Sequence, residues 1–307
     1  MNRLSRILSA VDFSESARAA FDHALVLSRT HIAELTVVHA IPKEEPFRRY
    51  ARERIAMIAA LRQAAEAAGV RFKVSVQQGD PAGVILLHAR SRRPDLIVLG
   101  TNQRSGLERL RLGSVAEAVT LQATQPVLVV PAFAEGRGAA VVRSFSNIVA
   151  AVDLGAATSA TVEGALSVAN STNGRVTLVH VVQGTSRASV SRHTYHYDVP
   201  EYQKPLAEHA WRRLQDLIPL NARTAERIHA RVVTGDPSTE ITRIAADLDA
   251  DLIVVGVTLR GAIGRRIFGA TAARLIRTAG RPVLAVPHRE DRRAIPPAEM
   301  ESLRAAA

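Results

Sequence analysis

The sequence has 307 residues, which is long enough for two domains of common size, and its 47% hydrophobic content is sufficient for two buried cores. No apolar run approaches the roughly 18 residues of a membrane span, and the first residues lack the apolar core of a signal peptide, so we expect a soluble, cytoplasmic protein without membrane contact. The absence of cysteine excludes disulfides, zinc–thiolate sites and thiol catalysis.

The charge is strongly basic, with 40 Lys and Arg against 29 Asp and Glu. Only Lys43, Lys73 and Lys204 are lysines, so arginine supplies almost all of the excess. The arginines are dispersed and alternate with acids, and aromatic residues make up only 4% of the chain. We therefore assign the charge mainly to the solvated surface and expect no specific nucleic-acid partner.

In chain order, the first half alternates short apolar runs with helical patterns. The runs at 7–11, 35–39, 95–100 and 126–131 lack alternation, which is typical of strands buried on both faces. Ser14 is the expected N-cap of the first helix, and an alanine-rich second helix over 55–68 ends at Gly69. Pro81, directly after Asp80, is expected in the first turn of the third helix.

The second half repeats this order. The segment 7–12 recurs at 148–153 and the segment 35–39 at 176–180, both 141 residues apart, whereas Gly79-Asp80-Pro81, 95–100 and 126–131 recur 156 residues later. The second copy therefore carries 15 additional residues, in the stretch 184–204. Five matching segments in the same order indicate an internal duplication.

Strands alternating with helices predict an α/β fold, here two tandem five-stranded parallel-sheet domains with helices on both faces. We place domain 1 at 1–134, a linker at 135–145, domain 2 at 146–288 and a C-terminal tail at 289–307.

Open α/β sheets bind ligands at the carboxyl ends of their strands. In the first copy Asp12 follows the first strand, and Gly100 ends the fourth strand. A loop then leads to Gly113 and Ser114 at the start of a helix, where backbone N–H groups and the helix dipole favour phosphate.

The Asp after strand one, the Gly-x2-Gly-x9-Gly-[Ser/Thr] spacing after strand four and the closing Pro-Val-Leu-Val-Val together resemble the universal stress protein family, whose tandem members hold two such domains. The resemblance covers nearly the whole chain. It implies a sheet ordered 3-2-1-4-5 of the adenine nucleotide alpha hydrolase-like type, and domains that pair through their fifth strands, within this chain or in a homodimer.

In one branch of that family the loop binds an adenine nucleotide. The resemblance then implies that Asp12 contacts the nucleoside, that the backbone at Ala40 contacts adenine, and that the loop holds the phosphates of ATP, with or without Mg²⁺. The implied nucleotide-binding residues of domain 1 are Asp12, Ala40, Gly100, Gln103, Gly113, Ser114 and Val115. A weaker second site consists of Asp153, Val181, Gly256, Gly269 and Ala270.

Both copies depart from the family spacing. Gln103 and Leu259 occupy the second glycine position, and Ala270 replaces the hydroxyl residue. Arg260, Arg265 and Arg266 offer cations to the second site, which is weakened rather than excluded.

Each of these residues also has a structural explanation. Ser114-Val115-Ala116-Glu117 fits a capping box, and Asp12 and Asp153 fit strand-end turns. Gly100 and Gly256 fit strand termination. His39 and His180 end apolar strands and are expected to be structural.

The additional segment of the second copy contains two histidines three residues apart, His193 and His196, followed by Asp198. Such residues can bind a metal, but the spacing does not position a third ligand, so we expect a contact or lid segment and no metal.

No nucleophile lies beside a base, so a dedicated enzyme is not expected. We predict a stress-associated regulatory protein that binds ATP or a related nucleotide, mainly in domain 1. The alternatives are a nucleotide-free scaffold that recruits unknown protein partners, and a slow ATPase.

Overall fold

The computed structural model describes residues 4–43, 47–101, 113–132, 145–183, 204–218, 227–259 and 269–289. The first half comprises β1 (Arg6–Ala10), α1 (Glu15–His31), β2 (Glu34–Ile41), α2 (Phe47–Ala67), β3 (Phe72–Gln78), α3 (Pro81–Arg92), β4 (Leu96–Thr101), α4 (Ser114–Gln122) and β5 (Val127–Pro131). The second half comprises β6 (Asn147–Ala151), α5 (Thr158–Thr172), β7 (Arg175–Val182), α6 (Lys204–Asp216), β8 (Ile228–Thr234), α8 (Pro237–Asp247), β9 (Leu252–Leu259), α9 (Ala270–Thr278) and β10 (Val283–Arg289).

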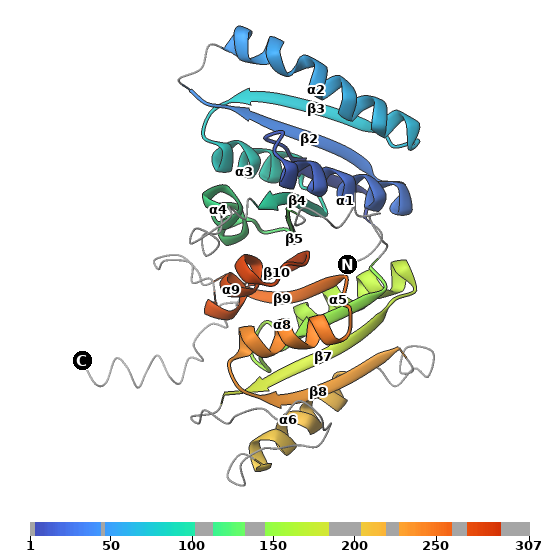
Figure 1. Ribbon diagram of the computed structural model, residues 1–307, viewed down its shortest axis with the longest axis vertical. Helices are drawn as coiled ribbons and strands as arrows, with labels where there is room; N and C mark the ends of the chain where they lie inside the picture. Colours follow the sequence, from blue (N-terminus) through green and yellow to red (C-terminus); the bar gives the residue numbers. More distant parts are fainter. Residues whose placement is uncertain are drawn as a thin grey trace, which may run out of the picture.

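All of these strands lie in one sheet, in the order β3-β2-β1-β4-β5-β10-β9-β6-β7-β8 (Figure 1). Each half has the order 3-2-1-4-5 with parallel neighbours, which confirms the predicted fold class. The halves meet where β5 and β10 pair antiparallel, with Val129 opposite Val283. The fifth-strand pairing implied by the family resemblance is therefore made within this chain.

Two apolar cores lie on opposite faces of the sheet, and each extends through both halves. One packs α1, α2, α5 and α6 against the sheet and includes Phe21, Leu35 and Leu178. The other packs α3, α4, α8 and α9 and includes Ile97, Val129 and Ile253. Because consecutive strand residues point to opposite faces, neighbours such as Val127 and Leu128 enter different cores, which explains the uninterrupted apolar runs.

Two predicted helix ends in the first copy are confirmed, the start of α1 and the end of α2, whereas α2 begins at Phe47, ahead of the predicted start at Ile55. The Ser14 side chain accepts a hydrogen bond from the N–H of Ala17 at 3.2 Å, and therefore caps α1. Gly69 lies just beyond α2 with φ +68°, and its N–H donates to the carbonyl of Glu66. A left-handed residue after a helix favours glycine because it has no Cβ.

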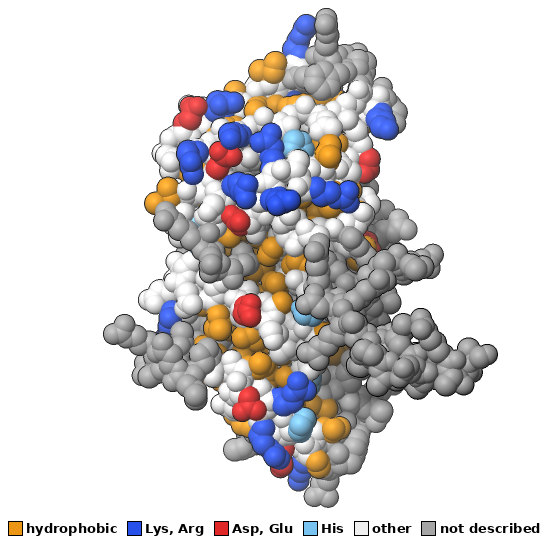
Figure 2. Space-filling view, turned by 180° about the vertical axis from the view of Figure 1, so that it is seen from behind, with side chains coloured by type: hydrophobic (Ala, Val, Ile, Leu, Met, Phe, Trp, Pro, Cys, Tyr) orange, Lys and Arg blue, Asp and Glu red, His pale blue; other side chains and the backbone are white. Residues whose placement is uncertain are grey.

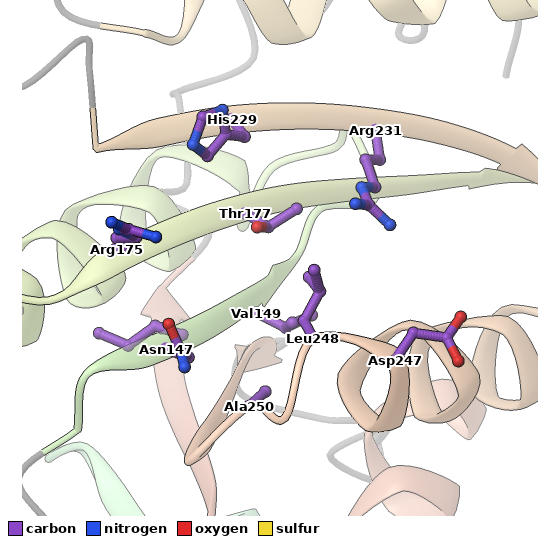
Figure 3. A pocket seen from close by; sticks show the side chains of 10 residues that line it. Asn147, Val149, Arg175, Thr177, His229, Arg231, Asp247, Leu248 and Ala250 are labelled. Atoms are coloured by element: carbon purple, nitrogen blue, oxygen red, sulfur yellow. The ribbon is translucent and has the colours of Figure 1, made fainter. Parts of the chain in front are cut away.

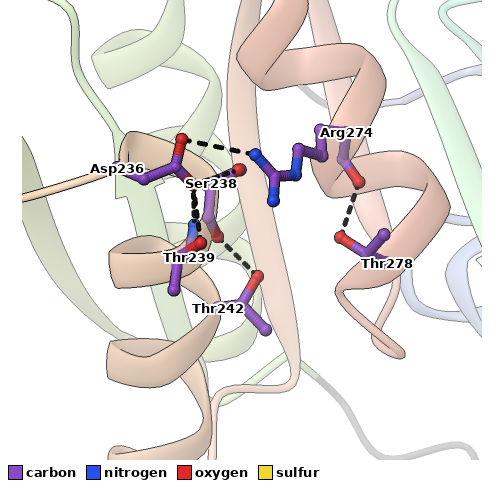
Figure 4. A network of polar contacts seen from close by, with 6 residues as sticks. All are labelled: Asp236, Ser238, Thr239, Thr242, Arg274 and Thr278. Atoms are coloured by element: carbon purple, nitrogen blue, oxygen red, sulfur yellow. Dashed lines mark hydrogen bonds and ion pairs between the residues drawn. The ribbon is translucent and has the colours of Figure 1, made fainter.

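The two Gly-Asp-Pro turns begin equivalent helices, with Asp80 capping α3 and Asp236 capping α8. Asp80 accepts from the N–H of Gly83 at 2.8 Å. Asp236 accepts from the N–H of Thr239 at 3.0 Å and from its hydroxyl at 2.6 Å, and it also contacts the hydroxyl of Ser238 and the guanidinium of Arg274 (Figure 4). The cap of α8 therefore has more partners than the cap of α3.

Asp236→Ala is expected to lower the free energy of unfolding by about 1 kcal/mol or slightly more, since N-cap removal costs that much and the exposed Arg274 pair adds little. Hydrogen bonds from Thr239 and then Ser238 lower the pKa of Asp236. Its stabilisation is therefore present above the pKa of the unfolded state and lost as pH falls through the folded value. Urea unfolding at neutral pH measures the effect, and Asp80→Ala is the matched control with fewer lost contacts. An equal or larger loss for Asp80→Ala would contradict the assignment.

The surface in Figure 2 mixes charges of both signs. Lys and Arg side chains gather over the first domain on this face, with acidic side chains among them. Such mixing is typical of a solvated protein surface. Within the part of the chain that the structure describes, no helix has both the length and the apolar content needed to cross a bilayer.

Candidate functional site

The carboxyl edge of the sheet in the first copy brings two predicted site residues close together. β1 lies between β2 and β4, which is where the strand order reverses. Ser9 of β1 is level with Val98 of β4. Two residues further along both strands, Val11 is level with Gly100, and Asp12 follows Val11 directly. Ligands of open α/β sheets bind at this reversal point.

Asp12 holds a tight turn between β1 and α1. Its Oδ1 accepts hydrogen bonds from the N–H of Ser14 at 2.9 Å and from the Ser14 hydroxyl at 2.5 Å, while Oδ2 accepts none from the described residues. Phe13 between them has φ +64°, an unfavourable value for a residue with a Cβ. The side chain of Asp12 is exposed, so the turn leaves one carboxylate oxygen facing solvent.

The second copy has the same turn. Asp153 accepts from the N–H of Gly155 at 2.8 Å and from the Thr158 hydroxyl at 3.3 Å, and Leu154 has φ +59°. The turn interpretation of both aspartates is confirmed. The left-handed residues Phe13 and Leu154 were missed by the sequence analysis, because nothing in their side chains marks such a backbone.

His39 and His180 support these turns from the neighbouring strands. The Nδ1–H of His39 donates to the carbonyl of Val11 at 2.7 Å, and that of His180 donates to the carbonyl of Val152 at 2.8 Å. The His39 ring also lies 4.7 Å from the Phe13 ring, centroid to centroid. Both histidines are therefore structural, as expected, and they fix the last carbonyl before each aspartate.

The buried histidines are expected to make stability depend on pH. Burial lowers the pKa of His23, His39 and His88, with Arg92 adding to the effect at His88. Because the unfolded state then binds protons more readily, the free energy of unfolding should fall as pH drops below about 6.5 and continue falling until the folded pKa values are passed. Urea unfolding between pH 8 and pH 5 measures the slope. His39→Asn, which retains an N–H donor, should reduce the slope, and an unchanged slope would contradict the role of His39.

Gly100 is required by packing. A Cβ placed there would lie 2.4 Å from the carbonyl carbon of Ser16 and 2.6 Å from the nitrogen of Ala17, both backbone atoms of α1. At Gly256, a Cβ would meet the Thr161 hydroxyl at 2.5 Å. The close approach of helix to strand accounts for both glycines without a ligand.

The start of α4 differs from its predicted capping box. Gly113 is the N-cap, with φ −56° and ψ +130°, and Ser114 is already helical. The carbonyl of Gly113 accepts the first intrahelical bond, from the N–H of Glu117 at 3.0 Å. A capping box needs Ser at the N-cap and Glu three residues later, so the predicted box at Ser114 is wrong by one position.

The start of α4 consequently has no side-chain cap. Its first backbone N–H groups, at Ser114, Val115 and Ala116, together with the exposed Ser114 hydroxyl, form a donor set of the kind that binds anions. Among the described residues, no atom lies within 4 Å of a Cβ placed at Gly113.

α9 begins in the same way at Gly269, also without a side-chain cap and with no atom of the described residues within 4 Å of an added Cβ. Ala270 occupies the position of Ser114 and supplies no hydroxyl. The two helix starts therefore share a backbone geometry and differ in one polar side chain.

The other predicted site residues fall in different places. Ala40 is partly buried within β2 and level with Gln77, and Val181 is buried within β7. Both lie inside strands rather than after them. Gln103, Arg260, Arg265, Arg266, the side chain of Leu259, and most of the 184–204 segment and of the C-terminal tail lie outside the described residues.

Comparison with known proteins gives a consistent result for both copies. The model of the family described as "Universal stress protein family" matches residues 4–131 and 144–287. Universal stress protein MJ0531 of Methanocaldococcus jannaschii is 31% identical over 144 residues, covering 42% of this chain and 83% of that protein. Universal stress protein YxiE of Bacillus subtilis is 29% identical over 145 residues, covering 41% of this chain and 98% of that protein.

A solved universal stress protein from Archaeoglobus fulgidus has the same fold over nearly the whole chain. It superposes with a TM-score of 0.69 at 19% identity, covering 92% of this chain and 98% of that structure. Since the family model matches two successive segments that together make up most of the sequence, the chain belongs to the universal stress protein family and carries two tandem copies of its domain.

Proposed function

We propose that this protein is a stress-associated regulator whose first domain binds ATP or a related adenine nucleotide at the carboxyl edge of its sheet. The observation that carries the proposal is the start of α4, where the N-cap Gly113 has no side chain to bond the first N–H groups and no other described residue lies within 4 Å of a Cβ placed there. Phosphate oxygens would satisfy its N–H groups and interact favourably with the helix dipole.

The remaining contacts follow the family pattern. Asp12 would accept a hydrogen bond from the nucleoside through Oδ2, since Oδ1 is engaged by Ser14. Ala40 would present backbone to adenine, while Gln103, Ser114 and Val115 would surround the phosphates. Gly100 contributes indirectly by letting α1 approach β4.

The second domain is proposed to bind nucleotide more weakly. Asp153 and the start of α9 at Gly269 repeat the geometry of the first domain, but Ala270 offers no hydroxyl. Val181 and Gly256 complete that weaker site. One missing hydrogen bond to a charged group corresponds to roughly 1.5–3 kcal/mol, enough to separate the two affinities by more than tenfold.

Magnesium would arrive with the nucleotide. Among the described residues there is no group of three or more His, Cys, Asp or Glu side chains arranged for a metal. Mg²⁺ is commonly bound through substrate phosphates and one or two carboxylates, so the exposed Asp12 carboxylate is compatible with such an ion.

Bound nucleotide would act as a signal of cellular state by stabilising the conformation that binds it, to an extent set by its concentration relative to the dissociation constant. Any hydrolysis would be slow. Phosphate release that does not exceed that of the Gly113→Val, Asp12→Ala double variant would rule out the ATPase alternative.

The protein purified without added nucleotide provides the test of occupancy. Small molecules released on denaturation and identified by mass spectrometry should include an adenine nucleotide, and Asp12→Ala should reduce its amount while the matched Asp153→Ala should not. Release of no nucleotide, from this preparation and again after incubation with millimolar ATP and removal of the excess, would instead support the scaffold alternative.

A further inference from the structure

Four exposed arginines of the first domain lie at the amino-terminal edge of its sheet, where α3 ends and β4 begins. They come from separate parts of the chain, since Arg6 is the first residue of β1, whereas the others are at the end of α3, namely Arg90, Arg92 and Arg93. This edge is opposite to the proposed nucleotide site, because α3 runs back from the carboxyl ends of the strands to their amino ends. We call these four residues the basic surface.

Asp95 holds Arg6 beside the end of α3. Its Oδ2 accepts hydrogen bonds from the N–H groups of Ser5 and Arg6 at 2.6 and 2.9 Å, and its own N–H donates to the carbonyl of Arg6 at 2.8 Å. Arg93 precedes Asp95 by only two residues. Leu8 belongs to the core under α3, so the side chain of Arg6, two residues earlier on the strand, lies on the same face of the sheet.

Arg92 is connected to β3 through His88. The Nε–H of Arg92 donates to Nδ1 of His88 at 3.3 Å, so the ring proton is on Nε2, which donates to the hydroxyl of Ser75 at 3.2 Å. Burial, and then the charge of Arg92, lower the pKa of His88, which keeps the ring neutral at neutral pH. This contact fixes the position of Arg92 without cancelling its charge.

The acids at this edge do not neutralise the basic surface. Glu34 is level with Arg6, but its carboxylate pairs with Lys73 at 2.9 Å. The Asp95 carboxylate accepts two backbone N–H groups. Within the part of the chain that the structure describes, no guanidinium of the basic surface forms an ion pair. The edge therefore carries four arginines and a lysine against two carboxylates.

The second domain builds the same edge without these arginines. The residues at the equivalent positions are neutral or acidic: Asn147 for Arg6, Ala246 for Arg90, Leu248 for Arg92 and Asp249 for Arg93. Asp251 repeats the role of Asp95 and accepts from the N–H of Asn147 at 2.9 Å. Asn147 and Leu248 line the pocket drawn in Figure 3. The fold therefore does not require arginine at any of the four positions.

The backbone at Arg93 supports a role outside the fold. Arg93 follows α3 with φ +46°, and Asp249 follows α8 with the same value. Aspartate is enriched in this left-handed conformation, whereas a long side chain is uncommon there. A position at which the backbone favours aspartate thus carries a cation in the first domain.

The basic surface fits phosphates on the outside of a rigid polyanion. Guanidinium groups bind phosphate oxygens through paired N–H donors. None of the four residues is aromatic, so the surface offers no platform for stacking unpaired bases. Membrane-binding faces combine cations with several large apolar side chains. On α3, Leu87 alone is large, apolar and exposed, so a duplex fits this surface better than a membrane.

We propose that the basic surface binds the phosphate backbone of a nucleic-acid duplex without reading its sequence. The arginines are dispersed along the chain, and the fold collects four of them at one edge. Contacts to phosphate position a protein on a duplex but carry no sequence information. The surface lies away from the proposed nucleotide site and does not depend on it.

Fluorescence anisotropy of a labelled, mixed-sequence DNA duplex, titrated with the full chain at about 50 mM salt, tests the proposal. Binding should be saturable and equal for duplexes of different sequence. It should weaken with salt, with a slope of log K against log salt concentration of roughly −3 to −4 for four phosphate contacts. A duplex RNA of the same length is titrated in parallel, and the tighter complex identifies the type of nucleic acid.

The matched variants install the residues of the second domain. Arg6→Asn, Arg90→Ala and Arg92→Leu should each reduce the magnitude of the salt slope by about one. Combining them with Arg93→Asp should weaken binding at least about a hundredfold at low salt. Arg93→Asp alone should not lower the free energy of unfolding, because the left-handed backbone accepts aspartate. Arg212→Asn, which removes an exposed cation from α6, should leave binding unchanged.

The Gly113→Val variant separates this surface from the nucleotide site and should bind the duplex with wild-type affinity. Absence of saturable duplex binding at low salt, salt slopes unchanged in all three single variants, or a combined variant that binds as the wild type does would overturn the proposal. So would a chain that binds phosphatidylserine vesicles through these arginines and does not bind duplex.

Discussion

Gly113→Val is expected to weaken ATP binding by the full chain at least about a hundredfold while leaving its urea midpoint unchanged. The φ angle of Gly113 is −56°, which valine adopts without strain, and no atom of the described part of the chain lies within 4 Å of the added Cβ. The branched side chain would therefore fill the space beside the first N–H groups of α4 without disturbing the fold. Calorimetric titration with ATP and Mg²⁺, with parallel urea unfolding, measures both effects.

The second domain provides a matched control for this substitution. Gly269 caps α9 with φ −55°, and an added Cβ there would likewise meet no described atom within 4 Å. Gly269→Val should leave the principal ATP affinity unchanged. If Gly113→Val bound ATP as tightly as the wild type, or if Gly269→Val caused the larger loss, the nucleotide site would have been assigned to the wrong place.

Gly100→Ala is expected to lower the free energy of unfolding by roughly 3 kcal/mol. The added Cβ would lie 2.4 Å from the backbone carbonyl carbon of Ser16, and backbone in the first turn of α1 cannot move aside without displacing the helix from the core. Urea unfolding of the variant at neutral pH measures the loss.

Gly256→Ala should also destabilise the fold. Its Cβ would meet the hydroxyl of Thr161 at 2.5 Å and the Cβ of Ala157 at 2.6 Å. The Thr161 hydroxyl donates to the carbonyl of Ala157 at 2.8 Å, and a Cβ is fixed to its backbone, so α5 would have to shift. A variant at either glycine that is as stable as the wild type would contradict the packing explanation.

The fold could be predicted from the sequence because the signals are local and repeated. Uninterrupted apolar runs marked strands buried on both faces, and the Gly-Asp-Pro turns marked the starts of α3 and α8. The duplication added independent support, since each element was predicted twice. The strand order and fifth-strand pairing came from the family resemblance, because periodicity alone does not specify which strands are neighbours.

The site was predicted less completely. Asp12 and Gly113 were singled out by their positions after the first strand and before the fourth helix, and their role in binding stays a prediction. The capping box at Ser114 was wrong because a motif does not show which residue has the extended backbone. The left-handed conformation of Phe13 has no side-chain signal. The pairing of β7 with β8 brings Arg175 and Arg231, more than fifty positions apart, onto one face of the sheet, and no local pattern in the sequence indicates this.

The two domains therefore have the same fold and differ in exposed side chains. The first retains a hydroxyl at the start of α4 and neutralises Lys73 with Glu34. The second has alanine at the start of α9 and arginines on its sheet face. These substitutions leave the buried strands intact, so the domains can diverge in binding without loss of the common sheet.

The most direct test of nucleotide binding is calorimetric titration of the full, nucleotide-free chain with ATP and Mg²⁺. We expect one dominant site per chain, together with a rise in melting temperature that increases with ATP concentration. Absence of both binding heat and thermal shift at millimolar ATP would contradict the account and leave the nucleotide-free scaffold as the better description.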